Sequence, residues 1–101
     1  MSAKGYLVVE AKVTDPEAYA RYRTLAATAV AEFGGRYLVR GGPAEILEGP
    51  WTAPERLVII EFDSVEQVKA FYDSPAYRAA RAERAGAAEM NMLVVEGHQQ
   101  Q

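Results

Sequence analysis

Four short segments of the chain consist mainly of apolar residues, and such short runs predict four β-strands. β-branched residues are frequent in most of these segments, as is typical of strands. The predicted strands cover residues 6–13, 36–40, 57–62 and 92–96. We expect residues 44–48 to continue the second strand, after an interruption at Gly41-Gly42-Pro43 that fits a bulge or a bend.

Apolar residues at helical spacing follow the first strand and predict one long helix. Asp15 is suited to cap its first turn, Pro16 fits the first helical position, and Glu17 interacts favourably with the helix dipole. The helix should end at Gly34-Gly35, because glycine readily adopts the left-handed conformation that helix ends often need. Its apolar stripe consists of Tyr19, Tyr22, Leu25, Ala26, Ala29, Val30 and Phe33.

A second helical region follows the third strand, and a proline interrupts it. Ser64 is placed to cap its start, and Gln67 completes the pattern of a capping box. Ser74 and Pro75 then break and restart the helix, as a new cap and a first helical residue. Gly86 marks the predicted end of this region.

The predicted order of elements is βαββαβ, in two halves of similar length. This order is typical of the α+β class and of its ferredoxin-like arrangement. Right-handed crossovers would place both helical regions on one face of a four-stranded antiparallel sheet. We therefore predict a single domain over residues 1–97, followed by a frayed tail at residues 98–101.

Three of the strands have one wholly apolar face and a second face that is apolar at first and then acidic. We expect the wholly apolar faces to meet the helices. They consist of Leu7, Val9, Ala11 and Val13 in the first strand, Val58, Ile60 and Phe62 in the third, and Leu93 and Val95 in the last. The opposite faces are still too apolar for water. The simplest cover is the same face of a second copy, which predicts a homodimer with an interior cavity.

Carboxylates from three strands should lie near the rim or floor of that cavity. They are Glu10, Glu61 and Glu96, and the candidate counter-charges are Arg36, Arg40 and Arg56. A carboxylate in an apolar cavity has a raised pKa and can act as a base, which would make a proton-transfer site. The alternative is that each glutamate sits at a wet strand end or pairs with an arginine, and this alternative carries more weight because paired structural carboxylates are common.

Other side chains are candidates for ligand contacts. Arg84 shares a helical stripe with Arg78 and Arg81, which either binds an anion or forms a solvated face. Tyr77 follows the helix restart and either points its hydroxyl into a pocket or packs over the helix break. Trp51, in a proline-rich loop, could be a lid over the cavity, but a dimer contact or plain packing carries more weight because tryptophan is enriched at interfaces.

Composition excludes several functional classes. The chain has 101 residues and a net charge of −3, so we expect neither nucleic acid nor an anionic membrane as a partner. It contains no cysteine and one histidine, His98, without partners at ligand spacing, so we predict no metal site and no cofactor. No apolar run approaches the roughly 20 residues of a membrane span, and no signal peptide is apparent, so we expect a cytoplasmic protein.

A set of motifs spread over the whole chain resembles one family. They lie in residues 34–42, 45–51, 56–64, 71–77, 84–87 and 94–97. Together they are similar to the family called domain of unknown function 1330, although Phe71, Arg78 and Asp63 depart from residues common in that family. The resemblance implies a dimeric α+β barrel, an architecture shared with small antibiotic-biosynthesis-type monooxygenases and muconolactone isomerases. It implies no established activity.

Two functional hypotheses remain open from the sequence. In the first, the dimer encloses a cavity for a small organic acid and performs cofactor-independent proton transfer, isomerisation or oxygenation, a chemistry suggested by fold analogy. Glu61 or Glu10 would then be the base, and Arg40, Arg56 or Arg84 would hold a carboxylate, with Trp51 and Tyr77 as further contacts. In the second, the protein is a non-catalytic ligand-binding or structural dimer.

Overall fold

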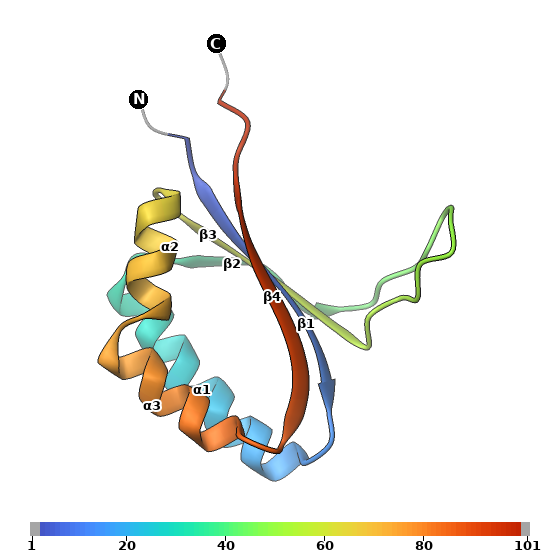
Figure 1. The fold of residues 1–101 in the computed structure, drawn as a ribbon, viewed down its shortest axis with the longest axis horizontal. Helices are drawn as coiled ribbons and strands as arrows, with labels where there is room; N and C mark the ends of the chain where they lie inside the picture. The colour runs from blue at the N-terminus through green and yellow to red at the C-terminus, as the bar shows by residue number, and fades with distance from the viewer. Residues whose placement is uncertain (1–2, 100–101) are drawn as a thin grey trace.

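The computed structural model describes residues 3–99, and in them four strands form one antiparallel sheet (Figure 1). The strands lie in the order β2-β3-β1-β4. Along the chain the elements are β1 (Gly5–Val13), α1 (Pro16–Glu32), β2 (Arg36–Gly42), β3 (Arg56–Phe62), α2 (Val65–Tyr72), α3 (Pro75–Arg84) and β4 (Ala88–Glu96). The predicted ferredoxin-like order is confirmed, with the second helical region divided into α2 and α3.

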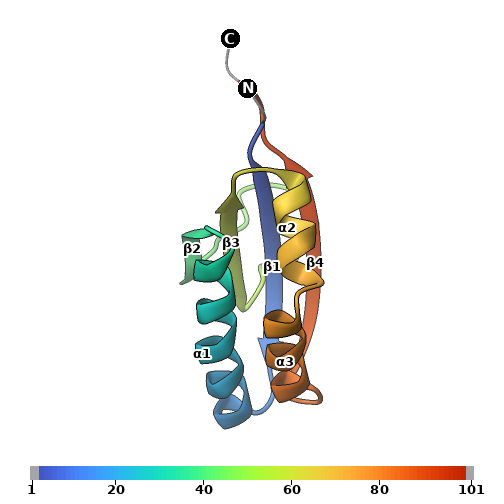
Figure 2. The ribbon, with the colours of Figure 1, turned by 90° about the vertical axis from the view of Figure 1, so that its left-hand side faces the viewer.

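All three helices lie on one face of the sheet, with α1 in one column and α2 followed by α3 in another (Figure 2). The predicted caps are confirmed at all three starts. Asp15 Oδ1 accepts a hydrogen bond from the Ala18 amide at 3.3 Å, and Ser64 Oγ accepts one from the Gln67 amide at 3.0 Å. The side-chain nitrogen of Gln67 donates to the Phe33 carbonyl at the end of α1 and so links the two helices.

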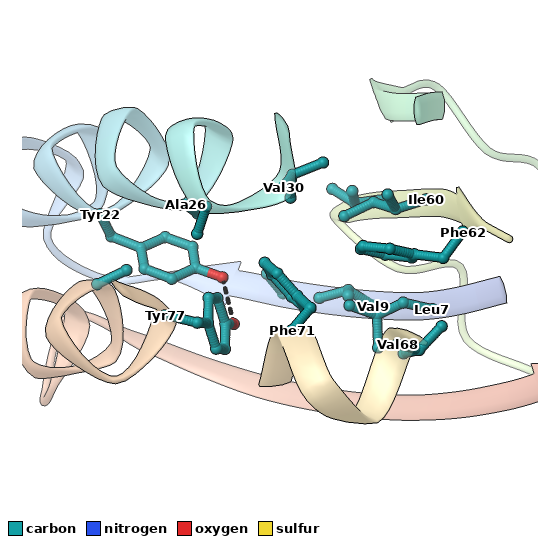
Figure 3. Close-up of a cluster of buried hydrophobic side chains, with 14 of the residues drawn as sticks. Leu7, Val9, Tyr22, Ala26, Val30, Ile60, Phe62, Val68, Phe71 and Tyr77 are labelled. Atoms are coloured by element: carbon teal, nitrogen blue, oxygen red, sulfur yellow. Dashed lines mark hydrogen bonds between the residues drawn. The ribbon is translucent and has the colours of Figure 1, made fainter. Parts of the chain in front are cut away.

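The core lies between the helices and the sheet, and its centre is a group of rings (Figure 3). The five largest fully buried side chains are Tyr77, Phe62, Phe71, Val30 and Val68. Leu7 and Val9 of β1 and Ile60 of β3 lie against this group, as the alternation predicts. The expectation for Leu25 is wrong, since that side chain lies on the exposed side of α1.

The prediction for the faces of β4 is wrong. Met92 and Val94 pack against the core, whereas Leu93 and Val95 are 56% and 47% exposed on the opposite face. The register explains the difference, because Met92 is paired with Val9 and Val94 with Leu7, and paired residues of neighbouring strands lie on the same face. The strand also begins earlier than predicted, at Ala88.

Residues 44–48 do not continue β2. Residues 43–55 instead form an irregular loop that extends away from the sheet (Figure 1). The interruption at Gly41 is real, because the pairing of β2 with β3 shifts between Arg40 and Gly42 and Gly41 has a φ of 80°. None of the helices in the part of the chain that the structure describes is long and apolar enough to cross a membrane.

The chain enters and leaves the sheet at the same end. The Gly97 amide donates to the Lys4 carbonyl at 2.7 Å, so pairing next to β1 extends just beyond β4. Of the predicted tail at residues 98–101, residues 100 and 101 lie outside the described part of the chain.

Candidate functional site

The structure distributes the candidate site residues over two sides of the sheet. We call the side without helices the second face. It carries Tyr6, Val8 and Glu10 of β1, Leu57, Ile59 and Glu61 of β3, and Asn91, Leu93 and Val95 of β4. Arg40, Arg56 and Tyr77 instead line a cavity on the helix side. The predicted combination of a glutamate base with an arginine clamp is therefore split by the sheet.

Glu61 is held by two hydrogen-bond donors on the second face. Arg36 Nε donates to its Oε1 at 3.0 Å, and Tyr6 donates its hydroxyl to Oε2 at 2.8 Å. Arg36 also forms an ion pair with Glu61 through its terminal nitrogen, as predicted. These bonds hold the pKa of Glu61 below its ordinary value, with the Arg36 hydrogen bond as the largest cause. Glu61 is a paired, ionised carboxylate.

Glu10 lies beside a broad basin on the second face. Its Oε1 accepts a hydrogen bond from the Asn91 amide nitrogen at 2.9 Å. The basin has a volume of about 510 Å³ and is lined mainly by apolar side chains, among them Val8, Ile46, Leu57, Ile59 and Leu93. Trp51 and Pro54 of the loop form its outer wall, and Trp51 is 69% exposed.

The cavity on the helix side is smaller and lies between the three helices and the sheet. It holds about 30 Å³, room for about one or two water molecules. Four tyrosines line it, together with apolar side chains of the core and three arginines. The tyrosines are Tyr19, Tyr22, Tyr37 and Tyr77, and the arginines are Arg23, Arg40 and Arg56. We call this space the helix-side cavity.

Two tyrosines meet inside this cavity. The hydroxyls of Tyr22 on α1 and Tyr77 on α3 lie 2.7 Å apart and share a hydrogen bond (Figure 3). Tyr77 is only 1% exposed, and its hydroxyl is also 3.7 Å from the sulfur of Met92. Burial raises the pKa of both hydroxyls, so both remain protonated at neutral pH and can donate a hydrogen bond.

Arg84 lies next to this pair, near the end of α3. Its guanidinium carbon is 5.3 Å from the centre of the Tyr22 ring, within range of a cation–π contact. Its Nε is buried and has no hydrogen-bond partner among the described residues. The positive charge of Arg84 opposes the effect of burial on the pKa of Tyr77. Its neighbour on the predicted stripe, Arg81, stacks instead over Tyr72 at 4.4 Å.

Arg40 and Arg56 do not pair with the glutamates of the second face, which corrects that prediction. Each projects from its strand toward the helices, since Arg40 is paired with the buried Val58 and Arg56 with the buried Ala11. The guanidinium of Arg40 lies 4.3 Å from the Tyr37 ring centre, and that of Arg56 lies 5.8 Å from the Tyr19 ring centre. Both therefore stand over aromatic rings at the wall of the helix-side cavity.

A groove of about 350 Å³ adjoins this cavity at the surface. Three residues line both spaces: Tyr19, Arg23 and Arg56. The rest of the groove is formed by Val13, Pro16 and Ala20. We call it the outer groove. Its apolar floor and its two arginines suit a small molecule that has an apolar body and a negative charge.

Sequence reasoning missed the tyrosine cluster as a site. Tyr19 and Tyr22 belong to the predicted apolar stripe of α1, which is correct for their rings but says nothing about where their hydroxyls point. The only signal was the presence of tyrosine, rather than leucine or phenylalanine, at two buried helical positions. No group of three or more histidine, cysteine, aspartate or glutamate side chains within residues 3–99 could hold a metal ion.

Comparison with known families gives one match. The sequence pattern of the family described as Domain of unknown function (DUF1330) matches residues 4–98. No curated protein sequence matches the chain.

Several solved structures share the fold. A protein of unknown function from Rhodopseudomonas palustris superposes with a TM-score of 0.76 at 19% identity, over 99% of this chain and 86% of that one. SnoaB, a cofactor-independent oxygenase from Streptomyces nogalater, has a TM-score of 0.59 at 12% identity, over 98% and 97% of the two chains. A dimeric protein of unknown function with a ferredoxin-like fold, from Bacteroides fragilis, has a TM-score of 0.56 at 17% identity, over 92% and 95%. At such identities the likeness shows the fold.

Proposed function

The chain belongs to the DUF1330 family, which has no established activity, and we propose that it binds a small organic molecule in the helix-side cavity and acts on it without a bound cofactor. The observation that carries this proposal is the buried Tyr22–Tyr77 hydroxyl pair at the wall of a cavity that three arginines also line. A small organic acid is the ligand class that these charges favour.

The cavity alone is too small for such a molecule. The inner space accommodates a single polar group, and the outer groove would hold the body of the ligand. A carbonyl or hydroxyl oxygen at the inner end would accept a hydrogen bond from the tyrosine pair. If negative charge develops on that oxygen during a reaction, donors fixed in a dry site stabilise it more strongly than water does.

Cofactor-independent oxygenation or isomerisation is the reaction class that we propose. Support for it comes from the fold shared with SnoaB, a cofactor-independent oxygenase, and this support is by analogy. In this assignment Glu61 has a structural role, because Arg36 and Tyr6 hold its carboxylate on the other side of the sheet.

We also propose that two copies associate through the second face. Exposed Leu93, Val95 and Trp51 support this, since monomeric proteins rarely leave such a continuous apolar surface in water. The basin would then be enclosed between the copies, with Glu10 and Trp51 at its wall. A small apolar ligand in that basin, with Glu10 as a base, is the second candidate function.

Native mass spectrometry of freshly purified protein tests the first candidate, with a denaturing run beside it. We expect a bound small molecule that denaturation releases, and conversion of that molecule in metal-free buffer. Tyr77→Phe should abolish conversion, whereas Tyr72→Phe, which makes the same chemical change outside the cavity, should retain it. Equal activity of both variants would contradict the role of the tyrosine pair. Loss of activity in Glu10→Gln alone would favour the basin instead.

A further inference from the structure

Arg56 stands between the outer groove and the helix-side cavity, because it lines both. It is a strand residue at the start of β3, so its backbone is fixed by pairing with Ala11 of β1. Its Nε is buried and has no hydrogen-bond partner among residues 3–99. A buried donor without a partner is costly, and no hydrogen bond from Nε fixes the direction of this side chain within the described residues.

Gly41 provides the space that the guanidinium of Arg56 occupies. A Cβ atom at position 41 would overlap Nη1 of Arg56. Gly34, Gly49 and Gly86 also have a positive φ, but a Cβ at any of them would meet open space. Any side chain at position 41 would therefore displace Arg56, since the end of a long flexible side chain yields more easily than a paired backbone.

The charges around Arg56 lack a protein counter-ion. Arg23, Arg40 and Arg56 all line the helix-side cavity. Within the described part of the chain, the ion pairs are Lys4–Asp63, Arg21–Glu83 and Arg36–Glu61, so none of them neutralises these three guanidiniums. Guanidinium groups bind carboxylates through paired hydrogen bonds, and the apolar walls of the outer groove suit a flat apolar body.

We propose that Arg56 is the specificity-determining residue of this site, which selects ligands carrying a carboxylate over neutral molecules of the same shape, and that Gly41 is the residue that positions it. This inference rests on the proposed function of the helix-side cavity. The ligand class is an aromatic or otherwise flat carboxylic acid, with its carboxylate at Arg56 and its body in the outer groove.

The test compares benzoate with benzamide, which has nearly the same shape and no charge. Calorimetric titration gives the Kd of each probe for the wild-type protein, Gly41→Ala, Gly34→Ala and Arg56→Lys. Gly34→Ala is the matched control, because it introduces the same strain at a positive φ with nothing near the new methyl group. The resonance of Arg56 Nε–H in the ligand-free proteins reports whether the guanidinium has moved.

We expect the wild type to bind benzoate at least about tenfold more tightly than benzamide, the factor that corresponds to one charge-assisted hydrogen bond. Gly41→Ala should shift the Arg56 resonance and remove most of this preference, while Gly34→Ala should change neither. Arg56→Lys should retain part of the preference, because the charge remains and the planar fork is lost.

Each contrary result has a distinct meaning. Equal binding of the two probes by the wild type would leave a ligand cavity in place and overturn the selective role of Arg56. An equal loss for both probes in Gly41→Ala, or the same loss in Gly34→Ala, would mean a general structural effect and overturn the positioning role of Gly41. If the wild type binds neither probe, both this inference and the proposed function fail.

Discussion

At the scale of single residues, Glu61 shows how hydrogen-bond partners determine the pKa of a carboxyl group and therefore its role. Its position at the end of an apolar stretch is compatible with a catalytic base that has a raised pKa. The hydrogen bonds from Arg36 and Tyr6 have the opposite effect and lower the pKa. The same contacts make Glu61, which lies in β3, a link between three strands, since Tyr6 belongs to β1 and Arg36 to β2.

This network predicts an acid-dependent contribution to stability. A carboxyl group whose pKa is lowered in the folded state stabilises the fold above its unfolded pKa, here about 4.5, and loses this effect as pH falls through the folded pKa. Glu61→Gln should therefore reduce the free energy of unfolding at neutral pH, and the difference from wild type should shrink below about pH 4.5. Urea unfolding between pH 2 and 7 measures it.

Glu48→Gln is the control for this experiment, because Glu48 is exposed in the loop of residues 43–55. It should leave the pH dependence of unfolding close to that of the wild type. A difference for Glu61→Gln that grows toward acidic pH would contradict the stabilising network and would indicate a carboxyl with a raised pKa.

Residue identity alone could not have revealed the tyrosine–arginine cluster. Tyr22 and Tyr77 are 55 positions apart in the sequence, and their hydroxyls meet only because α1 and α3 pack side by side. The sequence indicates Arg56, Arg84 and Tyr77 individually as candidate ligand contacts. Alternation along β3 places Arg56 on the same face as Val58, so the side of the sheet on which Arg56 lies follows from the sequence, whereas its position beside Gly41 and Tyr19 depends on how distant segments pack.

At the scale of elements, local signals predicted the helices better than the last strand. Caps, prolines and terminal glycines act within a few residues, so the starts of α1, α2 and α3 could be located from sequence. Which face of β4 meets the helices depends on register with β1, which is a contact between distant segments. Both faces of β4 are apolar over Met92 to Val95, so the composition of the strand left its orientation undetermined.

The junction between α2 and α3 is an element boundary that also positions the candidate site. Ser74 Oγ accepts a hydrogen bond from the Tyr77 amide at 3.1 Å and donates one to the Phe71 carbonyl at 2.7 Å. The serine is itself buried. It therefore connects the end of α2 to the first turn of α3, from which the Tyr77 ring enters the core.

Ser74→Ala should destabilise the fold by about 1–2 kcal/mol, because it removes a helix cap and a buried hydrogen bond. Amide hydrogen exchange at Tyr77 should become faster. The control is Ser64→Ala, which removes the equivalent cap of α2 and should accelerate exchange at Gln67 instead. If both variants accelerate exchange at Tyr77 equally, the cap acts on the whole domain and not on the position of this tyrosine.

At the scale of the whole molecule, the sheet separates two sides that differ in how their apolar side chains are shielded from water. On the helix side most apolar side chains are buried in the molecule's own core, and the second face retains exposed apolar side chains. If a second copy covers the second face, Ile59 becomes buried in the dimer although the fold of each chain stays the same. Ile60, in contrast, is already buried within one chain, with 4% of its surface exposed. Neighbouring residues of β3 thus report on two different processes, association and folding.

Ile59→Asp should yield a folded monomer, and Ile60→Asp should fail to fold. A charge at position 60 would be buried without a partner, at a cost of several kcal/mol, which is comparable to the total stability of a small domain. A charge at position 59 would remain in water in the single chain and would oppose contact between two second faces. Native mass spectrometry gives the mass of each assembly, and circular dichroism reports folding.

Ala79→Asp, on the exposed side of α3, should remain a folded dimer. A wild-type monomer at micromolar concentration would contradict the proposed association, and equal effects at positions 59 and 60 would contradict the assignment of the two faces.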